Sequence, residues 1–214
     1  ALRALGRLRK RNEPCLAQYR PHIALREPPM NVPTNLDETR AQLESWNAPN
    51  AIQAATRDRI VAFMREHPKD ANLRTCLEGH LTGSCLMVDA ARTSVLLHHH
   101  RKLDKWLQFG GHADGDPDLR NVALRELIEE SGIEPAWFSP AAIDLDIHSI
   151  PERGTEPEHL HLDVRFLAIA PEGAQPEVSA ESKEVCWIPI TQIGDLELDE
   201  SVTRLIDLIP TLPR

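Results

Sequence analysis

The sequence predicts an α/β protein. Segments with the composition of β-strands lie on both sides of one strongly marked helix near the middle of the chain, and further helical segments lie toward its two ends. The 214 residues suit one domain with extensions, and a hydrophobic content of 41% is enough to build a core. Together these observations predict a sheet that packs against helices.

Composition narrows the function classes. The net charge of −9 argues against general binding of nucleic acid through its phosphate backbone, and no segment has the length of a membrane span. The cysteines show neither CxxC pairs nor the spacing of a disulfide framework. We therefore expect a cytoplasmic protein with free thiols, and neither nucleic acid nor a membrane as partner; the cysteines are Cys15, Cys76, Cys85 and Cys186.

The chain divides into three predicted parts. Residues 1–34 form a basic extension that we expect to be poorly ordered, because Pro14, Pro21, Pro28 and Pro29 interrupt any long helix. Residues 35–70 are predicted to form helices that pack on the core, and residues 71–214 to form the main domain. The two helices are expected at Leu36 to Trp46 and Ala51 to Glu66, separated by Pro49.

Strands are predicted after these helices from short apolar or alternating runs bounded by turn residues. The first two form a hairpin that turns at residues 90–93. A closing helix is predicted at Thr203 to Leu208. The expected strands are Gly79 to Val88, Ser94 to His98, Lys105 to Phe109, Ile143 to Ile150, Leu160 to Ile169 and Glu184 to Ile188.

The central helix is marked at both ends. Asp116 is a suitable N-cap, and Pro117 suits the first helical position, where its missing N–H costs nothing. Gly132 suits the position just after the last helical residue. The helix is therefore predicted from Pro117 to about Ser131, with an apolar stripe packed on the sheet; the stripe consists of Leu124, Leu127 and Ile128.

The opposite side of this helix is acidic. Glu126, Glu129 and Glu130 have offsets of zero, three and four, which place all three carboxylates on one helical face. Like charges so placed repel one another, so a positive group is expected beside them. Carboxylates together with a main-chain carbonyl from the Gly110-Gly111 turn are hard oxygen ligands suited to Mg²⁺ or Mn²⁺.

The stretch from Gly111 to Ile133 resembles the Nudix box. Eight of the nine fixed positions of that motif match, and Pro117 replaces the first glutamate. We expect Asp116 or Asp118 to take over the pairing of that glutamate with Arg125. A second departure is Phe109, where the family often has proline. The matching residues are Gly111, Arg125, Glu126, Leu127, Glu129, Glu130, Gly132 and Ile133.

The resemblance implies a Nudix-type α/β/α sandwich with a mixed central sheet and a metal-dependent pyrophosphohydrolase activity, with residues 71–214 as the hydrolase domain. It implies that Gly111, Glu126, Glu129 and Glu130 hold the metal and that Arg125 orients the carboxylates. A further carboxylate is needed as general base. The preferred candidate is Glu181, in the loop before the last strand, with Glu184 and Glu129 as rivals.

Histidines supply the remaining candidates. Neighbouring side chains of a strand point to opposite faces, so residues 98–100 cannot converge on one metal, and a structural or surface role is expected for them. His159 and His161 share a strand face with Asp163 and are candidates to line the substrate pocket, with a solvated edge as the open alternative. Gly110 and His112 are candidates to contact a phosphate.

The expected substrate is a small-molecule diphosphate, namely a nucleoside diphosphate linked to another group, such as a nucleotide sugar, ADP-ribose or a related compound. Two alternatives stay open. One is a Nudix domain that acts as a ligand-binding or regulatory module, and the other is an isoprenoid diphosphate isomerase, which would need an additional acid–base pair. Similar proteins are often dimers, so a homodimer is one expectation for the assembly.

Overall fold

A computed structural model describes residues 32–209 of the chain. The predicted extension therefore lies almost wholly outside the described residues. The helices are α1 (Leu36–Ser45), α2 (Ala51–Glu66), α3 (Leu119–Ser131) and α4 (Glu200–Leu208), with a 3₁₀ helix η2 (Ile190–Asp195). The strands are β1 (Gly79–Val88), β2 (Ser94–His100), β3 (Lys105–Leu107), β4 (Phe109–His112), β5 (Trp137–Phe138), β6 (Asp144–Ile150), β7 (His159–Ile169) and β8 (Ser182–Pro189).

All eight strands form one mixed sheet. The long strands β1 and β7 are parallel neighbours at its centre, and every other pairing is antiparallel. β1 also pairs with β2 and β4, β7 with β5 and β6, and β2 with β3 and β8. The parallel pair requires a long crossover between its two strands. That crossover contains α3, which is how the acidic helix comes to lie against the middle of the sheet.

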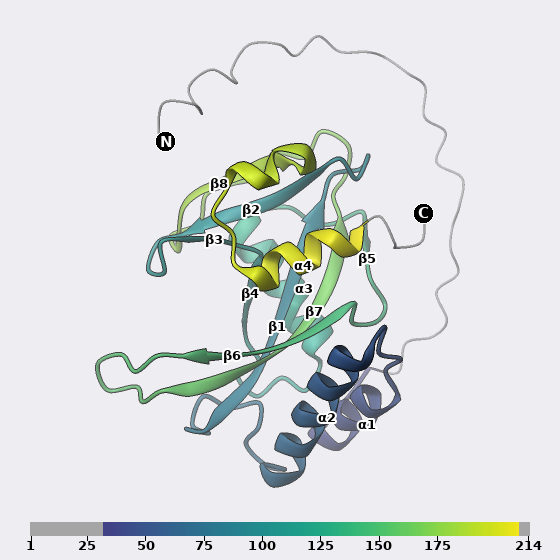
Figure 1. The fold of residues 1–214 in the computed structure, drawn as a ribbon, viewed down its shortest axis with the longest axis vertical. Coiled ribbons are helices and arrows are strands. Elements are labelled where there is room, and N and C mark those ends of the chain that lie inside the picture. The colour runs from purple at the N-terminus through teal and green to yellow at the C-terminus, as the bar shows by residue number, and fades with distance from the viewer. Residues whose placement is uncertain (1–31, 210–214) are drawn as a thin grey trace.

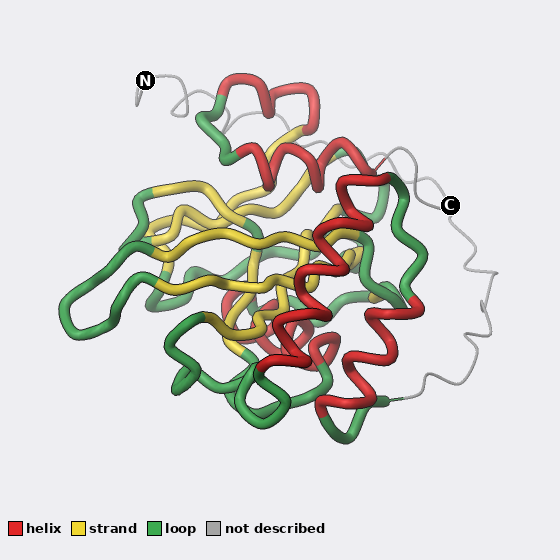
Figure 2. Tube along the Cα trace, turned by 60° about the horizontal axis from the view of Figure 1, so that its bottom comes forward, coloured by secondary structure: helices red, strands yellow, loops and turns green. Residues whose placement is uncertain are grey.

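Helices cover both faces of this sheet. In Figure 1, α4 crosses in front of the sheet and α3 lies behind it, and Figure 2 shows helices on both sides of the strands. The α/β/α fold expected from the sequence is thus confirmed. Because residues of a strand alternate between faces, the sheet divides the core in two. Leu81, Cys85 and Met87 of β1 pack on the α3 side, and Leu86 and Val88 pack on the α4 side.

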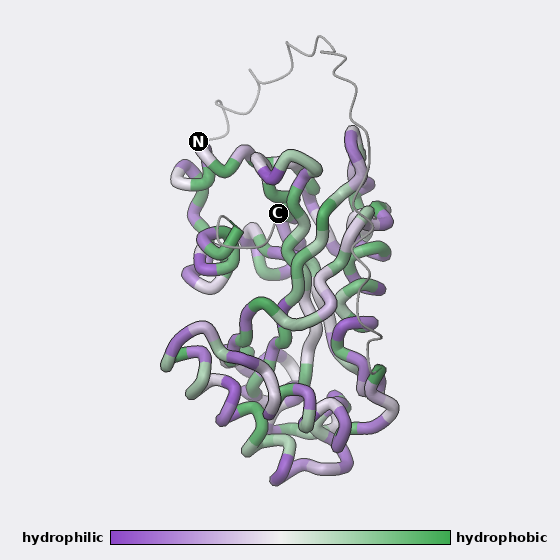
Figure 3. Tube along the Cα trace, turned by 90° about the vertical axis from the view of Figure 1, so that its right-hand side faces the viewer, coloured by the Kyte–Doolittle hydropathy of each residue, from purple (hydrophilic) through white to green (hydrophobic). Residues whose placement is uncertain are grey.

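The hydrophobic stretches run through the middle of the molecule and hydrophilic stretches are frequent at its outer edges (Figure 3). None of the helices described between residues 32 and 209 has the length and apolar character needed to cross a bilayer.

Several predicted boundaries shift. The run expected as one strand from Lys105 to Phe109 is divided between β3, which pairs with β2, and β4, which pairs with β1. The last helix begins at Glu200, because the side chain of Asp199 accepts the N–H of Ser201 as its cap. The last predicted strand extends to Ser182–Pro189, and the short strand β5 and the 3₁₀ helix were not predicted.

The N-terminal helices pack directly on the sheet. Leu43 of α1 and Ile60 and Met64 of α2 are buried in the core on the α3 side. Gln53 of α2 is 3% exposed and bonds to the outer edge of β6. Its side-chain amide donates to the carbonyl of Leu145 at 3.0 Å and accepts the N–H of Leu145 at 2.9 Å. One glutamine thus satisfies main-chain groups of β6 that no neighbouring strand pairs.

We expect Gln53→Ala to destabilise the fold by about 1–3 kcal/mol, because it leaves a buried donor and a buried acceptor of Leu145 without partners. Chemical denaturation measures this change. The control is Ile52→Ala on the same helix, whose side chain is exposed; it should change the free energy of unfolding by less than about 0.5 kcal/mol. Equal effects of the two substitutions would contradict this role for Gln53.

Candidate active site on the acidic helix

The start of α3 differs from the predicted one. Asp118, not Asp116, is the N-cap, and its carboxylate accepts the N–H groups of Arg120 and Asn121 at 3.1 and 3.2 Å. Pro117 precedes the cap, and its carbonyl accepts the hydroxyl of Thr39 of α1 at 2.7 Å. Asp116 instead accepts the side-chain amide of Asn121 at 2.8 Å. The end is as predicted, with Gly132 left-handed at φ 69°.

The buried face of α3 is rotated relative to the prediction. Leu127 is fully buried and Leu124 partly so, but Ile128 is 37% exposed. Val122 and Ala123 take its place against β1. At their contact point, a Cβ added to Gly83 of β1 would lie 2.5 Å from the carbonyl of Leu119, so only glycine lets the helix approach so closely.

Glu126 lies directly over the glycine loop. A Cβ on Gly111 would meet the three carboxyl atoms of Glu126 at 2.5 to 2.8 Å. The second glycine of the loop therefore provides the space for this carboxylate. Arg125 donates to Glu126 at 3.0 Å and to the carbonyl of His112 at 3.4 Å, which ties the helix to β4.

The prediction that Asp116 or Asp118 pairs with Arg125 is wrong. Among the ion pairs of residues 32–209, Arg125 pairs with Glu126, and neither Asp116 nor Asp118 pairs with it. Both aspartates are occupied in building the helix start, as described above. The positive group that the acidic face was expected to need is therefore supplied, in part, by the arginine of the box itself.

Glu130 is the most buried of the three glutamates, at 7% exposed. Its carboxylate accepts the N–H of Gly110 at 3.1 Å and lies 3.7 Å from Nδ1 of His98. The pKa of Glu130 is raised to about 8. Burial is the main cause, and the charges of Glu126, Glu181 and Glu129 add to it, whereas the hydrogen bond from the Gly110 N–H acts in the opposite direction. Three other acidic side chains thus lie close enough to Glu130 to affect it.

Glu129 is the exposed residue among the three glutamates. Within residues 32–209, the three glutamates are not among the sets of three side chains whose ligand atoms lie within 4.8 Å of one another. Glu126 and Glu130 are fixed on the glycine loop, whereas Glu129 points to solvent and is free to change rotamer. The oxygen donors fit a hard divalent cation in kind.

The two base candidates outside the helix lie differently. Glu181, in the loop before β8, is near enough to raise the pKa of Glu130, and its carboxylate lies 4.0 Å from Nε2 of His100. Glu184 pairs across the sheet with His99, and its neighbour Val185 faces the α3-side core. Glu184 therefore points to the opposite face, where burial and then the charge of Glu184 raise the pKa of Cys186.

The histidine run behaves as the alternation predicts. His98 and His100 lie on the side of the acidic helix, and His99 stacks on Trp106 on the other side. The sequence analysis did not predict the contacts that His98 makes. His98 is 2% exposed, and its Nδ1 lies 2.9 Å from the hydroxyl of Ser182, beside Glu130. Neither contact gives a local signal in the sequence, because the pairing of β2 with β8 brings Ser182 to His98, and the packing of α3 on the sheet brings Glu130 there.

The model of the family described as NUDIX domain matches residues 79–210. This match covers more than half of the chain and includes the acidic helix and the glycine loop. The chain belongs to the Nudix family. The predicted enzyme class, a Nudix-type pyrophosphohydrolase, is thereby confirmed at the level of the family.

Solved structures of Nudix proteins resemble the chain at low identity. A hydrolase of the NUDIX family from Clostridium perfringens is 20% identical and covers 63% of this chain and 98% of its own, with a TM-score of 0.49. The NUDIX domain of Shewanella oneidensis NrtR, complexed with ADP ribose, is 18% identical over 70% of this chain and 96% of its own, also at 0.49. No curated protein sequence matched. At these values the likeness carries nothing about substrate.

The histidines predicted to contact substrate, His112, His159 and His161, lie on the face of the Nudix sheet opposite α3. Gly111 points toward Glu126, so the next residue, His112, points away from it. His159 and His161 of β7 share that face, as predicted, with ring centroids 5.3 Å apart. His112 joins them, with its ring 4.9 Å from that of His161. Burial lowers the pKa of His161 to about 2 and, with the charge of Arg74, that of His112 to about 4.

No described cysteine offers a reactive thiolate. Cys85 is fully buried and burial raises its pKa well above the ordinary value. Burial also raises the pKa of Cys76, which contacts His67, and that of Cys186, to about 11. Cys15 lies outside the described residues. An isomerase that uses a thiol therefore gains no support from these residues of the Nudix domain.

Proposed function

We propose that the protein is a metal-dependent hydrolase that cleaves the diphosphate linkage of a nucleoside diphosphate joined to another group, such as a nucleotide sugar or ADP-ribose. One observation carries the proposal. Two glutamates of the Nudix helix are held against the Gly110-Gly111 loop, Glu126 over the missing Cβ of Gly111 and Glu130 on the N–H of Gly110. Such an arrangement gathers oxygen ligands where a cation and a diphosphate can meet.

Gly111, Glu126, Glu129 and Glu130 are the proposed ligands of Mg²⁺ or Mn²⁺, through the carbonyl of the glycine and the three carboxylates. When bound, the metal supplies positive charge to the phosphoryl oxygens and to an attacking water. Arg125 holds Glu126 in place through its 3.0 Å contact. The N–H of Gly110 holds Glu130 in the same way, so the protein fixes two ligands before substrate arrives.

Glu181 is the proposed general base. It is the acidic residue of the loop before β8 that interacts with Glu130, and its side chain is 62% exposed, which leaves it accessible to a water molecule. Glu184 points to the other face of the sheet. A base must lie within hydrogen-bond reach of the proton that it abstracts, and Glu181 meets this condition more readily than Glu184.

Glu181→Gln is expected to lower kcat by about 10²-fold, the lower end of the range typical of a lost general base. Glu184→Gln, a matched change three residues away, should keep nearly all of the activity. Steady-state kinetics on the best substrate measures both. If Glu184→Gln lost the activity and Glu181→Gln kept it, the base would be the residue on the opposite face and this assignment would be wrong.

A panel of nucleotide sugars, ADP-ribose and dinucleotides, incubated with Mg²⁺, tests the function. We expect a nucleoside monophosphate and the phosphorylated second group as products, and no turnover after chelation. The products decide between classes, because an isomerase releases no nucleoside monophosphate and a binding module turns over nothing. Binding of a panel member without any product would contradict the proposed hydrolysis.

A further inference from the structure

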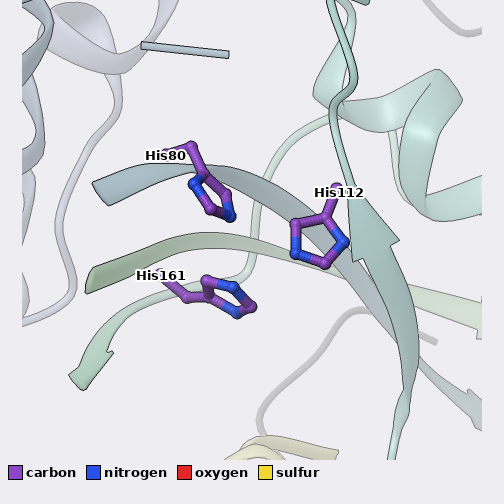
Figure 4. Close-up of side chains that lie close together, drawn as sticks. All are labelled: His80, His112 and His161. Atoms are coloured by element: carbon purple, nitrogen blue, oxygen red, sulfur yellow. The ribbon is translucent and has the colours of Figure 1, made fainter. Parts of the chain in front are cut away.

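Imidazole rings from three central strands meet on the sheet face opposite α3. β1 and β7 run in parallel with His80 directly opposite His161, and β4 places His112 opposite Thr82, two residues from His80 on the same face. The ring of His80 lies 4.9 to 5.0 Å, centroid to centroid, from those of His112 and His161. Figure 4 shows the three rings pointing toward one another.

These rings have nitrogens without partners. His80 is 4% exposed, and neither of its ring nitrogens has a hydrogen-bond partner. Nε2 of His161 is likewise buried and unpaired. The carbonyl of Cys76 is near enough to act on the pKa of His80, but not in hydrogen-bond geometry. Buried imidazole nitrogens are normally bonded, so unpaired ones on two neighbouring rings point to a ligand.

The nitrogens are also within reach of one ion. One ring nitrogen from each of His80, His112 and His161 lies within 4.8 Å of the other two. Ligand nitrogens of a tetrahedral zinc site lie about 3.3 Å apart, given Zn–N distances of about 2.0–2.1 Å. Small side-chain rotations would close the difference. His159, whose ring lies 4.9 Å from that of His80, is the nearest further donor for a fourth position.

We propose that His80, His112 and His161 form a binding site for a transition-metal cation, with Zn²⁺ as the best-fitting ion. This site is separate from the acidic one, because the consecutive residues Gly111 and His112 face opposite sides of β4. The two sites also differ in the ligand atoms that they offer. Imidazole nitrogens select zinc and its neighbours in the transition series, whereas carboxylates and carbonyls suit Mg²⁺ and Mn²⁺.

A second group of possible ligands, His67, Asp70 and Cys76, is weaker. Its members are already paired, since Sγ of Cys76 lies 3.4 Å from Nδ1 of His67 and Nε2 of His67 lies 3.6 Å from a carboxylate oxygen of Glu78. His67 is not among the described residues that have a buried nitrogen without a partner. It serves as a control for the histidine site.

The test uses the full chain, freed of metal by chelation and then titrated with Zn²⁺ in the presence of excess Mg²⁺. We expect one Zn²⁺ per chain that Mg²⁺ does not displace, and a visible absorption spectrum typical of tetrahedral nitrogen ligands when Co²⁺ is used instead. Glu129→Gln should leave zinc binding unchanged, because Glu129 belongs to the other site. The proposal fails if Zn²⁺ does not bind, or if Mg²⁺ or Glu129→Gln removes it.

Variants then identify the ligands. His161→Gln and His112→Gln should each weaken zinc binding by at least about 10- to 100-fold, a loss that even outer-shell partners produce. His67→Gln and His99→Gln should bind zinc as the wild type does. If His161→Gln does not fold, His112→Gln and the wild-type Co²⁺ spectrum decide the matter. Unchanged affinity in His112→Gln, or a spectrum typical of six oxygen ligands, would overturn the proposal.

Discussion

Glu129→Gln is expected to lower kcat by roughly 10³-fold while the protein stays folded. A metal that stabilises transition-state charge contributes several kcal/mol, and each 1.4 kcal/mol is a factor of about ten in rate. Glu129 is exposed, so its amide isostere disturbs no packing. The free energy of unfolding should change by less than about 0.5 kcal/mol, as is usual for surface positions. Steady-state kinetics and chemical denaturation measure the two quantities.

The matched control is Glu134→Gln, which changes an exposed glutamate just beyond the end of the same helix. It should leave kcat within about twofold. A folded Glu129→Gln enzyme with wild-type turnover would show that the acidic face of α3 is not the metal site. Activity that returns at high Mn²⁺ concentration would instead support the assignment, because a weakened site fills when more metal is supplied.

Arg165→Gln is expected to destabilise the fold by about 3–5 kcal/mol, the usual cost of removing one partner of a buried ion pair. Arg165 is 1% exposed on β7 and contacts three carboxylates of the α4 side of the sheet. Its guanidinium lies 2.8 Å from Asp163, 3.0 Å from Asp146 and 3.4 Å from Asp144. Arg204 of α4 pairs with two of these but cannot replace the charge that is lost.

Denaturant titration measures this loss. Arg65→Gln is the control, because its ion pair with Glu44 is on the surface with the arginine side chain 62% exposed, and such pairs contribute about 0–1 kcal/mol. A similar cost for both substitutions would contradict a structural role for the buried network.

The pH dependence of stability gives a second check on this network. Burial raises the pKa of Asp146. The hydrogen bond to His148, the charge of Arg165 and the hydrogen bond from Arg204 lower it by more, so the net pKa lies below the ordinary 3.8. The stability that Asp146 contributes is therefore complete above pH 3.8 and lost as the pH falls through the lower folded-state value. The deficit of Arg165→Gln should persist from neutral pH to about pH 4 and shrink below it.

The sequence alone located the acidic helix, the glycine loop and most strands, because these features depend on short-range spacing. Glu126, Glu129 and Glu130 share a helical face whatever the rest of the chain does. The predicted N-cap, Asp116, is wrong, because the helix begins after Pro117 and Asp118 caps it. A hydrogen bond from Thr39, far away in the chain, accompanies the observed start.

The histidine site could not be predicted in the same way. His80 and His161 are about eighty positions apart, and only the parallel pairing of β1 with β7 brings them together. The polar pattern of His161 and Asp163 was visible in the sequence, and so was the closing helix, but not the packing of that helix over the far end of the pattern. There Arg165 bonds to Ser201 of α4 and is buried.

The hydrogen bonds of Gln53 protect an outer strand of the sheet, β6. An outer strand with unpaired main-chain groups is a template on which another chain can add a strand. Here α2 lies along that strand and occupies its free groups at Leu145, although the matched family region begins only at residue 79. A truncated chain that starts at the family boundary would keep the acidic helix and the glycine loop but expose this edge. Its first defect in solution would be self-association through β6.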